Sequence, residues 1–324
     1  MSTKKDLVVN NLKVHFGGGR SMLSGRKPTV HAVDGVSFTI PAGKTFGVVG
    51  ESGSGKTTTA LAIMRLVDIT DGVVTLGDTE ISSLNKNDLR EARSQFQIIF
   101  QDPYSSLDPR KRAGEIVRQP LDLMSIGTPA ERETAVSELF TQVGLRPEQQ
   151  HLFPHQFSGG QRQRIGLARA LSTRPSLIVC DEPVSALDVA IQAQILNLMS
   201  RLQQELGLTY LFISHDLGVV QHICDEIAVM YLGQIVEQAD RVTLFKNPRH
   251  PYTKALLEAV PSVHGNKRDR RQRMRLPGDP PSPINLPVAC RFASRCPRAE
   301  ARCHSEVPLL EEKESGHKVA CFFG

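Results

Sequence analysis

A phosphate-binding pattern occupies residues 50–57, which read Gly-Glu-Ser-Gly-Ser-Gly-Lys-Thr. It follows an apolar run at residues 46–49 and opens a helical stretch, which is the context that a P-loop requires. Glycines let backbone N–H groups curl around phosphate oxygens, and the start of a helix presents its positive dipole to the anion. The Lys56 ammonium would lie near the β- and γ-phosphates, and the Thr57 hydroxyl is a hard oxygen ligand for Mg²⁺. The expected nucleotide contacts are Gly50, Ser52, Gly53, Ser54, Gly55, Lys56, Thr57 and Thr58.

Two carboxylates, Asp181 and Glu182, end the apolar run at residues 177–180. In open α/β sheets, ligands bind at the carboxyl ends of the strands. Asp181 would hold the Mg²⁺ shell. Glu182 would polarise an attacking water, because phosphoryl transfer needs positioning and charge stabilisation rather than covalent help. Taken alone, these residues are equally consistent with a solvated strand end, but together with the P-loop they predict a phosphoryl-transfer site.

A second glycine-containing segment, residues 157–161, reads Phe-Ser-Gly-Gly-Gln and precedes a stretch with apolar residues at helical spacing. Ser158 and Gln161 have the spacing of a capping box, and a well-capped helix would explain that spacing alone. Two glycines in a first turn weaken a helix, however, so a cap does not need them. A phosphate that approaches the backbone does need them, which makes this segment a second candidate phosphate contact.

The elements that would carry these motifs are an α/β core and a smaller antiparallel part. Continuous apolar runs are typical of buried parallel strands, and they indicate a doubly wound core. These runs lie at residues 46–49, 177–180, 210–213 and 227–230. Shorter β-branched runs bounded by Gly or Pro favour an antiparallel element at residues 7–16, 32–40 and 72–76.

A helical insertion is expected over about residues 102–170, because residues 102–157 are mostly polar and carry no strand signal. Residues 17–29 are rich in Gly, Ser and basic residues and are expected to form a mobile loop. After Asp188, apolar residues recur every three or four positions, which predicts one helix face in the core. That face consists of Ile191, Ile195, Leu198, Leu202 and Leu206.

The composition excludes several classes of protein. The chain has 324 residues and a formal net charge of +5, which is too small an excess to indicate a nucleic-acid partner. Aromatic residues make up 5% and Trp is absent, so few side chains could stack on bases. No apolar run approaches the ~18 residues that span a bilayer, and no secretory signal is evident. We therefore expect a cytoplasmic protein that does not itself cross a membrane.

The character of the chain changes near Ser262, where we place a boundary between domains at residues 1–262 and 263–324. Residues 261–308 hold eight of the 20 prolines, together with a basic run. That run could contact nucleic acid or anionic lipid, but among so many prolines a solvated linker is favoured. It consists of Lys267, Arg268, Arg270, Arg271, Arg273 and Arg275.

Four of the six cysteines lie close to the C-terminus, whereas Cys180 and Cys224 lie in apolar surroundings. In a reducing cytosol, disulfides are the less expected use of the four. Their spacings are not the short pairs of common zinc sites, yet four thiolates suit Zn²⁺ or an iron–sulfur cluster. Free thiols without a metal are a further alternative. The four residues are Cys290, Cys296, Cys303 and Cys321.

The motifs above, together with Gln101, residues 185–188 and residues 214–216, resemble in type and order those of the ATP-binding cassette (ABC) ATPases. The resemblance covers about residues 7–260. It implies a RecA-like parallel-sheet core, an antiparallel β subdomain and a helical subdomain, to which this chain would add a small Cys-rich C-terminal domain. It also implies a head-to-tail dimer, in which ATP lies between the P-loop of one protomer and residues 158–161 of the other.

The same resemblance implies roles for single residues. Gln101 would contact Mg²⁺ and the attacking water, His215 would hold the γ-phosphate, and Phe16 would stack on adenine. Taken alone, a His after a strand and a Phe at a strand end are more often structural. The residues expected to reach the ATP of the partner protomer are Ser158, Gly159, Gly160, Gln161 and Asp188.

The tail, with Asn-Pro-Arg-His-Pro-Tyr-Thr at residues 247–253, is similar to that of ATP-binding subunits of oligopeptide and dipeptide importers. This similarity implies a peripheral subunit at the cytoplasmic face of the inner membrane. The implied partners are two transmembrane permease subunits, a second homologous ATPase subunit and an extracytoplasmic solute-binding protein, and no nucleic acid. Residues 101–110 would dock a cytoplasmic helix of a permease subunit. The similarity also favours a structural [4Fe–4S] cluster over Zn²⁺ for the four cysteines.

Import of di- or oligopeptides is therefore the expected function, although opines, oligosaccharides and nickel use related machinery. One alternative is a soluble, non-transport ABC ATPase that acts on nucleic acid or ribosomes, which the basic run would favour. Such translation-type proteins usually carry two cassettes in one chain, and this chain has one. Another alternative is a small-molecule kinase, but that function would not explain the motif at residues 158–161.

Overall fold

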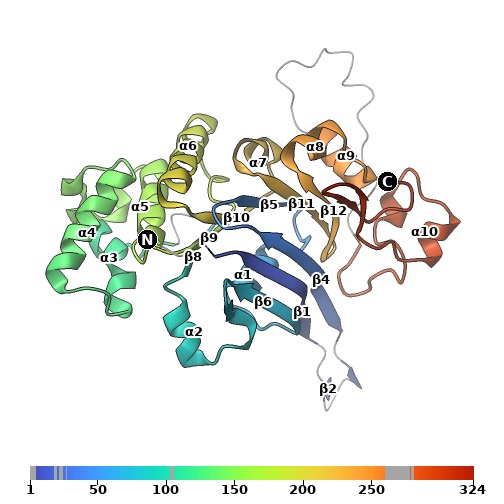
Figure 1. Cartoon of the computed structure of the whole chain (residues 1–324), viewed down its shortest axis with the longest axis horizontal. Helices are drawn as coiled ribbons and strands as arrows, with labels where there is room; N and C mark the ends of the chain where they lie inside the picture. The colour runs from blue at the N-terminus through green and yellow to red at the C-terminus, as the bar shows by residue number, and fades with distance from the viewer. Residues whose placement is uncertain are drawn as a thin grey trace. The chain divides into compact units, whose positions relative to one another are not determined.

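The computed structural model describes residues 5–17, 20–21, 25–26, 28–102, 106–259, 278 and 281–324. The chain divides into two compact units. Unit 1 takes in residues 1–7, 40–44 and 75–213, and unit 2 takes in residues 8–39, 45–74 and 214–324. In Figure 1 the chain can be followed by its colour from β1 to α10.

Three parallel strands in the order β8, β9, β10 form the sheet of unit 1. Their register pairs Cys180 of β9 with Phe212 of β10 and with Ile99 of β8. Every residue of β9 and β10 is buried, as the continuous apolar runs predict. The strands of this unit are β7 (Thr79–Glu80), β8 (Phe96–Ile99), β9 (Leu177–Asp181) and β10 (Thr209–Ser214).

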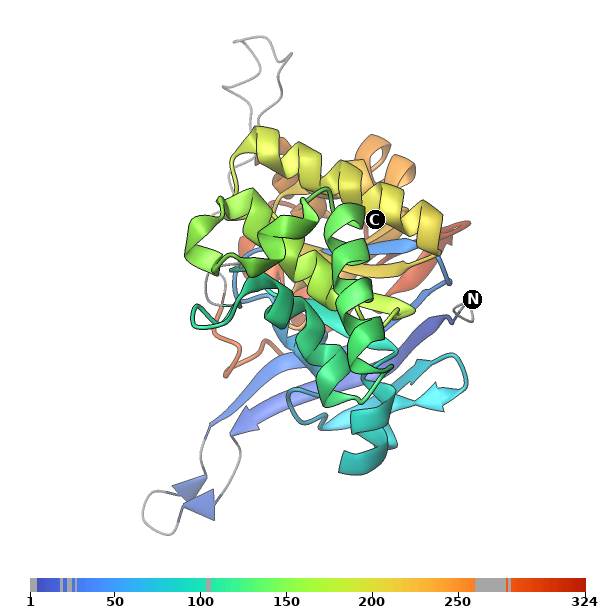
Figure 2. The same cartoon turned by 90° about the vertical axis from the view of Figure 1, so that its left-hand side faces the viewer.

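Helices cover most of the remainder of unit 1, and Figure 2 shows α3, α4 and α5 packed together with α6 beside α5. The residues expected to form a helical insertion provide α3, α4 and most of α5, between β8 and β9. The helices are α2 (Lys86–Ala92), α3 (Ala113–Leu123), α4 (Pro129–Gln142), α5 (Gly159–Leu171) and α6 (Val189–Leu206). The 3₁₀ helices are Ile81–Ser83, Pro147–His151 and Pro154–Gln156.

Unit 2 contains a sheet segment in the order β13, β14, β12, β11, β5. β5 and β11 are parallel, and β11 and β12 form an antiparallel hairpin. The C-terminal strand β14 adds to β12, so that Val319 pairs with Glu237. A separate small Cys-rich domain is therefore not supported, because the tail extends the sheet of unit 2.

The strands β4, β1 and the first part of β6 also lie side by side in unit 2. The runs expected at residues 7–16, 32–40 and 72–76 all form strands. The strands that belong mainly to this unit are β1 (Leu7–Gly17), β2 (Arg20–Ser21), β3 (Gly25–Arg26), β4 (Thr29–Ile40), β5 (Thr45–Val49), β6 (Asp71–Leu76), β11 (Glu226–Tyr231), β12 (Gln234–Asp240), β13 (Glu311–Glu314) and β14 (His317–Val319). Its helices are α1 (Lys56–Ile63), α7 (Leu217–Ile223), α8 (Arg241–Lys246), α9 (Pro251–Ala259), α10 (Ala301–Ser305) and the 3₁₀ helix Ala293–Arg295.

The predicted core face of α6 is correct in the middle of the helix and wrong at its ends. Ile195, Leu198 and Leu202 are buried, whereas Ile191 is only half-buried and Leu206 is 42% exposed. The difference arises because Ile191 lies in the first turn, near α5, and Leu206 is the last helical residue before the Gly207 cap.

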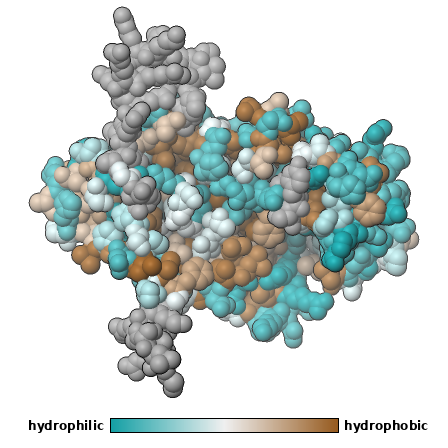
Figure 3. Space-filling view, turned by 180° about the vertical axis from the view of Figure 1, so that it is seen from behind, coloured by the Kyte–Doolittle hydropathy of each residue, from teal (hydrophilic) through white to brown (hydrophobic). Residues whose placement is uncertain are grey.

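Residues 17–29 are not simply a loop, since the short strands β2 and β3 pair antiparallel within them. Residues 18–19, 22–24 and 27 lie outside the described residues, as does the basic run at residues 267–275. No helix in the described ranges has both the length and the apolar character needed to cross a bilayer. Figure 3 shows a face on which hydrophobic residues lie among hydrophilic ones.

Candidate nucleotide site

The P-loop joins β5 to α1, and close contacts within unit 2 require two of its glycines. A Cβ at Gly50 would lie 2.2 Å from the carbonyl oxygen of Met230. Gly55 caps α1 with φ 104°, and a Cβ there would lie 2.2 Å from the carbonyl oxygen of Ala32. Gly53 has φ 79° and no atom within 4 Å of a Cβ position. Packing therefore accounts for Gly50 and Gly55, whereas the open space at Gly53 is where a phosphate can approach.

Two buried polar side chains of the loop fit an incoming phosphate. The Nζ atom of Lys56 donates to the carbonyl oxygens of Gly50 and Glu51, both at 2.8 Å. The buried Ser54 hydroxyl has no hydrogen-bond partner among the residues that the structure describes. Phosphate oxygens accept hydrogen bonds from both kinds of donor. The other predicted contacts at this loop are more accessible, with Ser52, Gly53 and Thr57 exposed and Thr58 half-buried.

The predicted catalytic carboxylate lies at the end of β9 in unit 1. Asp181 is 5% exposed, and Glu182 follows it with φ 48°, a conformation that is strained for a residue other than glycine. The Glu182 N–H donates to the carbonyl oxygen of Ile213 at 2.9 Å. The Gln101 side chain donates from Nε2 to Oε2 of Glu182 at 2.8 Å. The fold thus brings together two predicted site residues that lie 81 positions apart.

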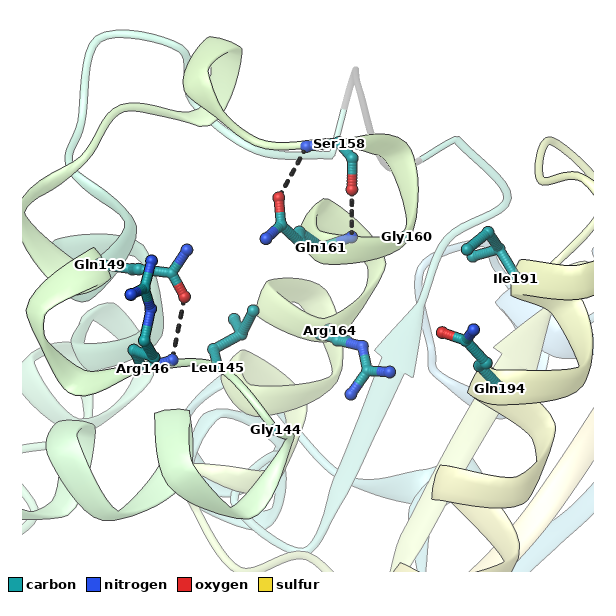
Figure 4. Close-up of a pocket in the computed structure, with 10 residues that line it drawn as sticks. All are labelled: Gly144, Leu145, Arg146, Gln149, Ser158, Gly160, Gln161, Arg164, Ile191 and Gln194. Atoms are coloured by element: carbon teal, nitrogen blue, oxygen red, sulfur yellow. Dashed lines mark hydrogen bonds between the residues drawn. The ribbon is translucent and has the colours of Figure 1, made fainter.

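The predicted capping box at the start of α5 is present. The Ser158 N–H donates to Oε1 of Gln161 at 3.0 Å, and the Gln161 N–H donates to the Ser158 hydroxyl at 3.4 Å, as Figure 4 shows. A pocket of about 340 Å³ opens beside this cap, within unit 1. Ser158, Gly160 and Arg164 contribute to its wall. This wall is polar and carries the positive charge of Arg164, which favours an anion.

Arg164 is fixed in that wall. Its Nη1 atom donates to the carbonyl oxygen of Val143 at 2.6 Å, and a Cβ at Gly144 would lie 2.7 Å from the same Nη1 atom. Burial, and secondly the charge of Arg201, lowers the pKa of Arg164 from its usual value.

Gly160 has a packing role that the sequence argument overlooked. A Cβ at this position would lie 2.5 Å from the Cγ2 atom of Ile191 in α6. Figure 4 shows Ile191 on the helix that faces the start of α5. The contact between α5 and α6 therefore explains Gly160 without a ligand.

The remaining predicted contacts lie at the ends of elements. Asp188 caps α6, with Oδ1 accepting from the Ile191 N–H at 3.0 Å. His215 is exposed immediately after β10. Phe16 is 43% exposed near the end of β1, so it is not the core residue that a strand-end Phe usually is. An exposed aromatic ring is available to contact a ligand.

The four C-terminal cysteines lie in unit 2 as free thiols. The Cys290 N–H donates to the carbonyl oxygen of Cys303 at 3.1 Å. Burial raises the pKa of Cys290, Cys296 and Cys321, and the charges of neighbouring thiols raise it further. Around tetrahedral zinc, sulfur atoms lie about 3.8 Å apart. No three of these sulfurs lie within 4.8 Å of one another in the described chain, so no zinc geometry is preformed.

Within unit 2, the tail contacts the P-loop and β4 through side chains that no sequence motif predicts. Glu51 forms an ion pair with Arg295, and its N–H donates to the Tyr252 hydroxyl at 2.8 Å. Arg291 forms an ion pair with Asp34. The one sequence feature that marks Arg291 and Arg295 is that they are adjacent to Cys290 and Cys296, in a segment that we expected to form a separate domain.

Comparisons with known proteins agree with these motifs. The model of the ABC transporter family matches residues 33–185, and that of the oligopeptide/dipeptide transporter C-terminal region matches residues 236–303. The oligopeptide transport ATP-binding protein AppF of Bacillus subtilis is 46% identical over 97% of this chain and 96% of its own length. A second Bacillus subtilis relative, YkfD, is 49% identical over 97% of this chain and 94% of its own length.

Among solved structures, the ATP-binding cassette MJ0796, a dimer bound to ADP and Pi, matches with a TM-score of 0.64 and 27% identity. The match covers 72% of this chain and 98% of MJ0796. The same cassette in a second dimeric structure matches with a TM-score of 0.63. Because two relatives are matched over nearly their whole lengths, the chain belongs to the ATP-binding proteins of ABC transporters, in the oligopeptide transport group.

Proposed function

We propose that this chain is the ATP-hydrolysing subunit of an ABC importer that takes up di- or oligopeptides or similar small solutes. The observation that carries the proposal is the hydrogen bond from Gln101 to Glu182. It orients a carboxylate at the carboxyl end of a buried parallel strand, where a water could be polarised for attack on a phosphate. AppF, which is named as an oligopeptide transport protein, supports peptides as the solute class.

In this proposal, the two phosphate-binding segments act on the nucleotides of a dimer. Lys56, the P-loop amides and the Ser54 hydroxyl bind the phosphates from one side. Ser158 and Gly160 reach the γ-phosphate of the partner protomer, with Asp188 beside that interface. Thr57 and Asp181 would hold Mg²⁺, which neutralises charge on the phosphate oxygens. His215 would contact the γ-phosphate, and Phe16 the adenine.

The proposed partners are two transmembrane permease subunits, a second ATPase subunit of the same family and an extracytoplasmic solute-binding protein, at the cytoplasmic face of the membrane. Residues 101–110, of which 103–105 lie outside the described residues, would dock a permease helix. Gln101 begins this segment, so movement of a docked helix would alter the contact between Gln101 and Glu182.

Substitution of Glu182 by Gln tests the proposed catalytic role. In the complex with the permease subunits, we expect Glu182→Gln to bind ATP normally and to lower turnover by about 10²–10⁴-fold, the usual contribution of a general base. The exposed Glu148 provides a matched control, because Glu148→Gln makes the same chemical change away from β9. Turnover of Glu182→Gln at the rate of the Glu148→Gln control would refute the role. Stimulation of turnover by peptide-loaded binding protein tests the solute class.

A second proposal concerns the tail, where we infer that Cys290, Cys296, Cys303 and Cys321 bind a [4Fe–4S] cluster that has a structural role. The donor set is four reduced thiols in one part of unit 2, with Cys290 and Cys303 joined through their backbones. Thiolates are the usual ligands of such clusters. Iron and sulfide analysis of the anaerobically purified chain should give four of each, and Cys296→Ser should lower both. A folded chain that contains zinc, or no metal, would contradict this proposal.

A further inference from the structure

Two histidines and an aspartate converge near the ends of β1 and β4, in a part of unit 2 to which no motif assigns a function. The Nε2 atom of His15 lies 3.2 Å from Oδ1 of Asp34 and 3.2 Å from Nδ1 of His31. The imidazole rings are tilted by 58° with their centroids 4.2 Å apart. All three residues are partly buried, so the group is reachable from solvent.

Hydrogen bonds alone do not satisfy all the polar atoms of these three side chains. The Nε2 atom of His15 carries either one hydrogen or one lone pair, yet two partners lie at hydrogen-bond distance from it. Asp34 is an acceptor when ionised, so Nε2 must donate to it. The same nitrogen then has no lone pair to accept from His31, and a single hydrogen would be shared by two acceptors. In the other tautomer of His15, whose hydrogen is on Nδ1, Nε2 presents a lone pair beside Nδ1 of His31 and Oδ1 of Asp34, and three ligand atoms then converge on one point.

A divalent cation at this point would satisfy the three lone pairs together. Zinc–nitrogen bonds of about 2.0–2.1 Å in tetrahedral geometry place neighbouring ligand atoms about 3.4 Å apart. Both distances from His15 Nε2 are close to this value, and all three ligand atoms lie within 4.8 Å of one another. We propose that His15, His31 and Asp34 form a binding site for Zn²⁺ or a similar borderline transition-metal ion, separate from the nucleotide and cysteine sites.

The surroundings of Asp34 suit a metal ligand. Arg291 forms an ion pair with Oδ2, which leaves Oδ1 directed towards His15. Ligating carboxylates commonly have such a partner on the second oxygen. Burial raises the pKa of Asp34, but the hydrogen bond and charge of Arg291 and the contact with His15 outweigh burial, so the net pKa lies below its usual value. The Asp34 carboxylate is therefore ionised at neutral pH.

The backbone holds the three side chains in place. The His15 N–H donates to the Thr70 hydroxyl at 2.8 Å, and the His31 N–H donates to the Pro283 carbonyl oxygen at 3.0 Å. The Asp34 N–H donates to the Gly233 carbonyl oxygen at 2.8 Å. Imidazole nitrogens with one carboxylate suit Zn²⁺, Ni²⁺ or Cu²⁺ rather than Mg²⁺ or Ca²⁺. With three protein ligands, the fourth position would be taken by water.

Metal counting in the full chain tests this site. The chelator-treated chain is equilibrated with Zn²⁺, desalted and analysed for bound metal beside the double variant His15→Gln/His31→Gln. We expect the wild type to hold one more Zn²⁺ per chain than the double variant. The exposed His151 provides the control, because His151→Gln removes an imidazole elsewhere and should keep that ion. Equal stoichiometry in wild type and double variant would overturn the proposal.

Cobalt spectroscopy separates this site from the cysteines. Thiolate ligation of Co²⁺ gives strong near-ultraviolet charge-transfer absorption, whereas imidazole and carboxylate ligation gives only the weaker visible bands. The difference spectrum between wild type and double variant should contain the visible bands alone. A thiolate band in that difference would assign the lost ion to the cysteines and overturn the proposal. If the double variant fails to fold by circular dichroism, the single variant His31→Gln, with one ligand removed, should bind Co²⁺ at least about tenfold more weakly, and unchanged affinity would be contrary to the proposal.

Discussion

The guanidinium of Arg295 binds the carboxylate of Glu51 through two hydrogen bonds, Nη1 to Oε2 at 2.8 Å and Nη2 to Oε1 at 3.2 Å. Glu51 is the second residue of the P-loop, and Arg295 precedes Cys296 in the tail, 244 positions along the chain. The Arg295 side chain is 6% exposed and that of Glu51 is 29% exposed. The tail therefore positions the phosphate-binding loop directly and is not merely an appendage.

Substitution of Arg295 by Met should weaken ATP binding and destabilise the protein. The unpaired Glu51 carboxylate would repel the phosphates. The stability loss should be roughly 2 kcal/mol, below the ~3–5 kcal/mol for a fully buried pair, because Glu51 is partly solvated. Nucleotide titration and denaturant unfolding measure the two effects. Arg298→Met is the matched control, since Arg298 lies in the same segment and contacts the Phe323 ring. Normal ATP affinity in Arg295→Met would contradict the positioning role.

Substitution of Gly160 by Ala should destabilise the protein by about 1–3 kcal/mol, because the added Cβ overpacks against Ile191. The double variant Gly160→Ala/Ile191→Ala should recover part of this loss. Gly166, in the same helix, has no atom within 4 Å of a Cβ position, so Gly166→Ala should stabilise by about 0.5–1 kcal/mol. Thermal and denaturant unfolding of the three variants would measure these differences. Equal effects of the two alanines would disprove the packing argument.

Substitution of Gln101 by Glu should place two carboxylates side by side, which raises the pKa of one of them. ATP hydrolysis depends on an ionised Glu182. As the pH is lowered, turnover of Gln101→Glu should therefore begin to fall about one pH unit or more above the pH at which wild-type turnover falls. The measurement is the pH dependence of ATPase turnover in the assembled complex. Gln101→Met removes the hydrogen bond without adding charge, so its profile should lose height and shift less than that of Gln101→Glu. A Gln101→Glu profile at the wild-type position would exclude direct contact in the working enzyme.

Burial lowers the pKa of His250 to about 3 from 6.5. The ring accepts a hydrogen bond at Nδ1 from the Tyr252 N–H, at 3.1 Å, and its own backbone N–H donates to Glu237. Between these two pKa values the unfolded chain binds one proton more than the folded chain. The stability contributed by neutral His250 is therefore complete above pH 6.5 and is lost as the pH falls towards 3.

His250→Gln should flatten this dependence, by up to about 1.4 kcal/mol per pH unit. Urea unfolding at several pH values between about 4.5 and 7.5, followed in wild type and variant, measures the difference. His151→Gln, at an exposed position, should keep the wild-type slope. Parallel curves for wild type and His250→Gln would show that this histidine titrates equally in both states.

The amino-acid sequence by itself determined where most of the core strands lie along the chain and the chemistry of the loops, because these depend on local patterns. The continuous apolar runs predicted β5, β9, β10 and β11 within a residue or two. The Ser158 and Gln161 spacing predicted the capping box of α5, which uses only neighbouring residues. The local patterns did not predict β8, which pairs with β9 in unit 1, or β12, which pairs with β11 in unit 2.

Only the tertiary structure decided which distant residues meet. The register of the paired strands brings Gln101 to Glu182, and the path of the tail brings Arg295 to Glu51. No local pattern encodes either contact. The same reason explains why the tail looked like a separate domain. Its composition differs from the rest of the chain, but composition does not reveal that β14 would pair with β12. Pairing between strands some 80 residues apart is a property of the folded backbone, and local residue patterns are too short to specify it.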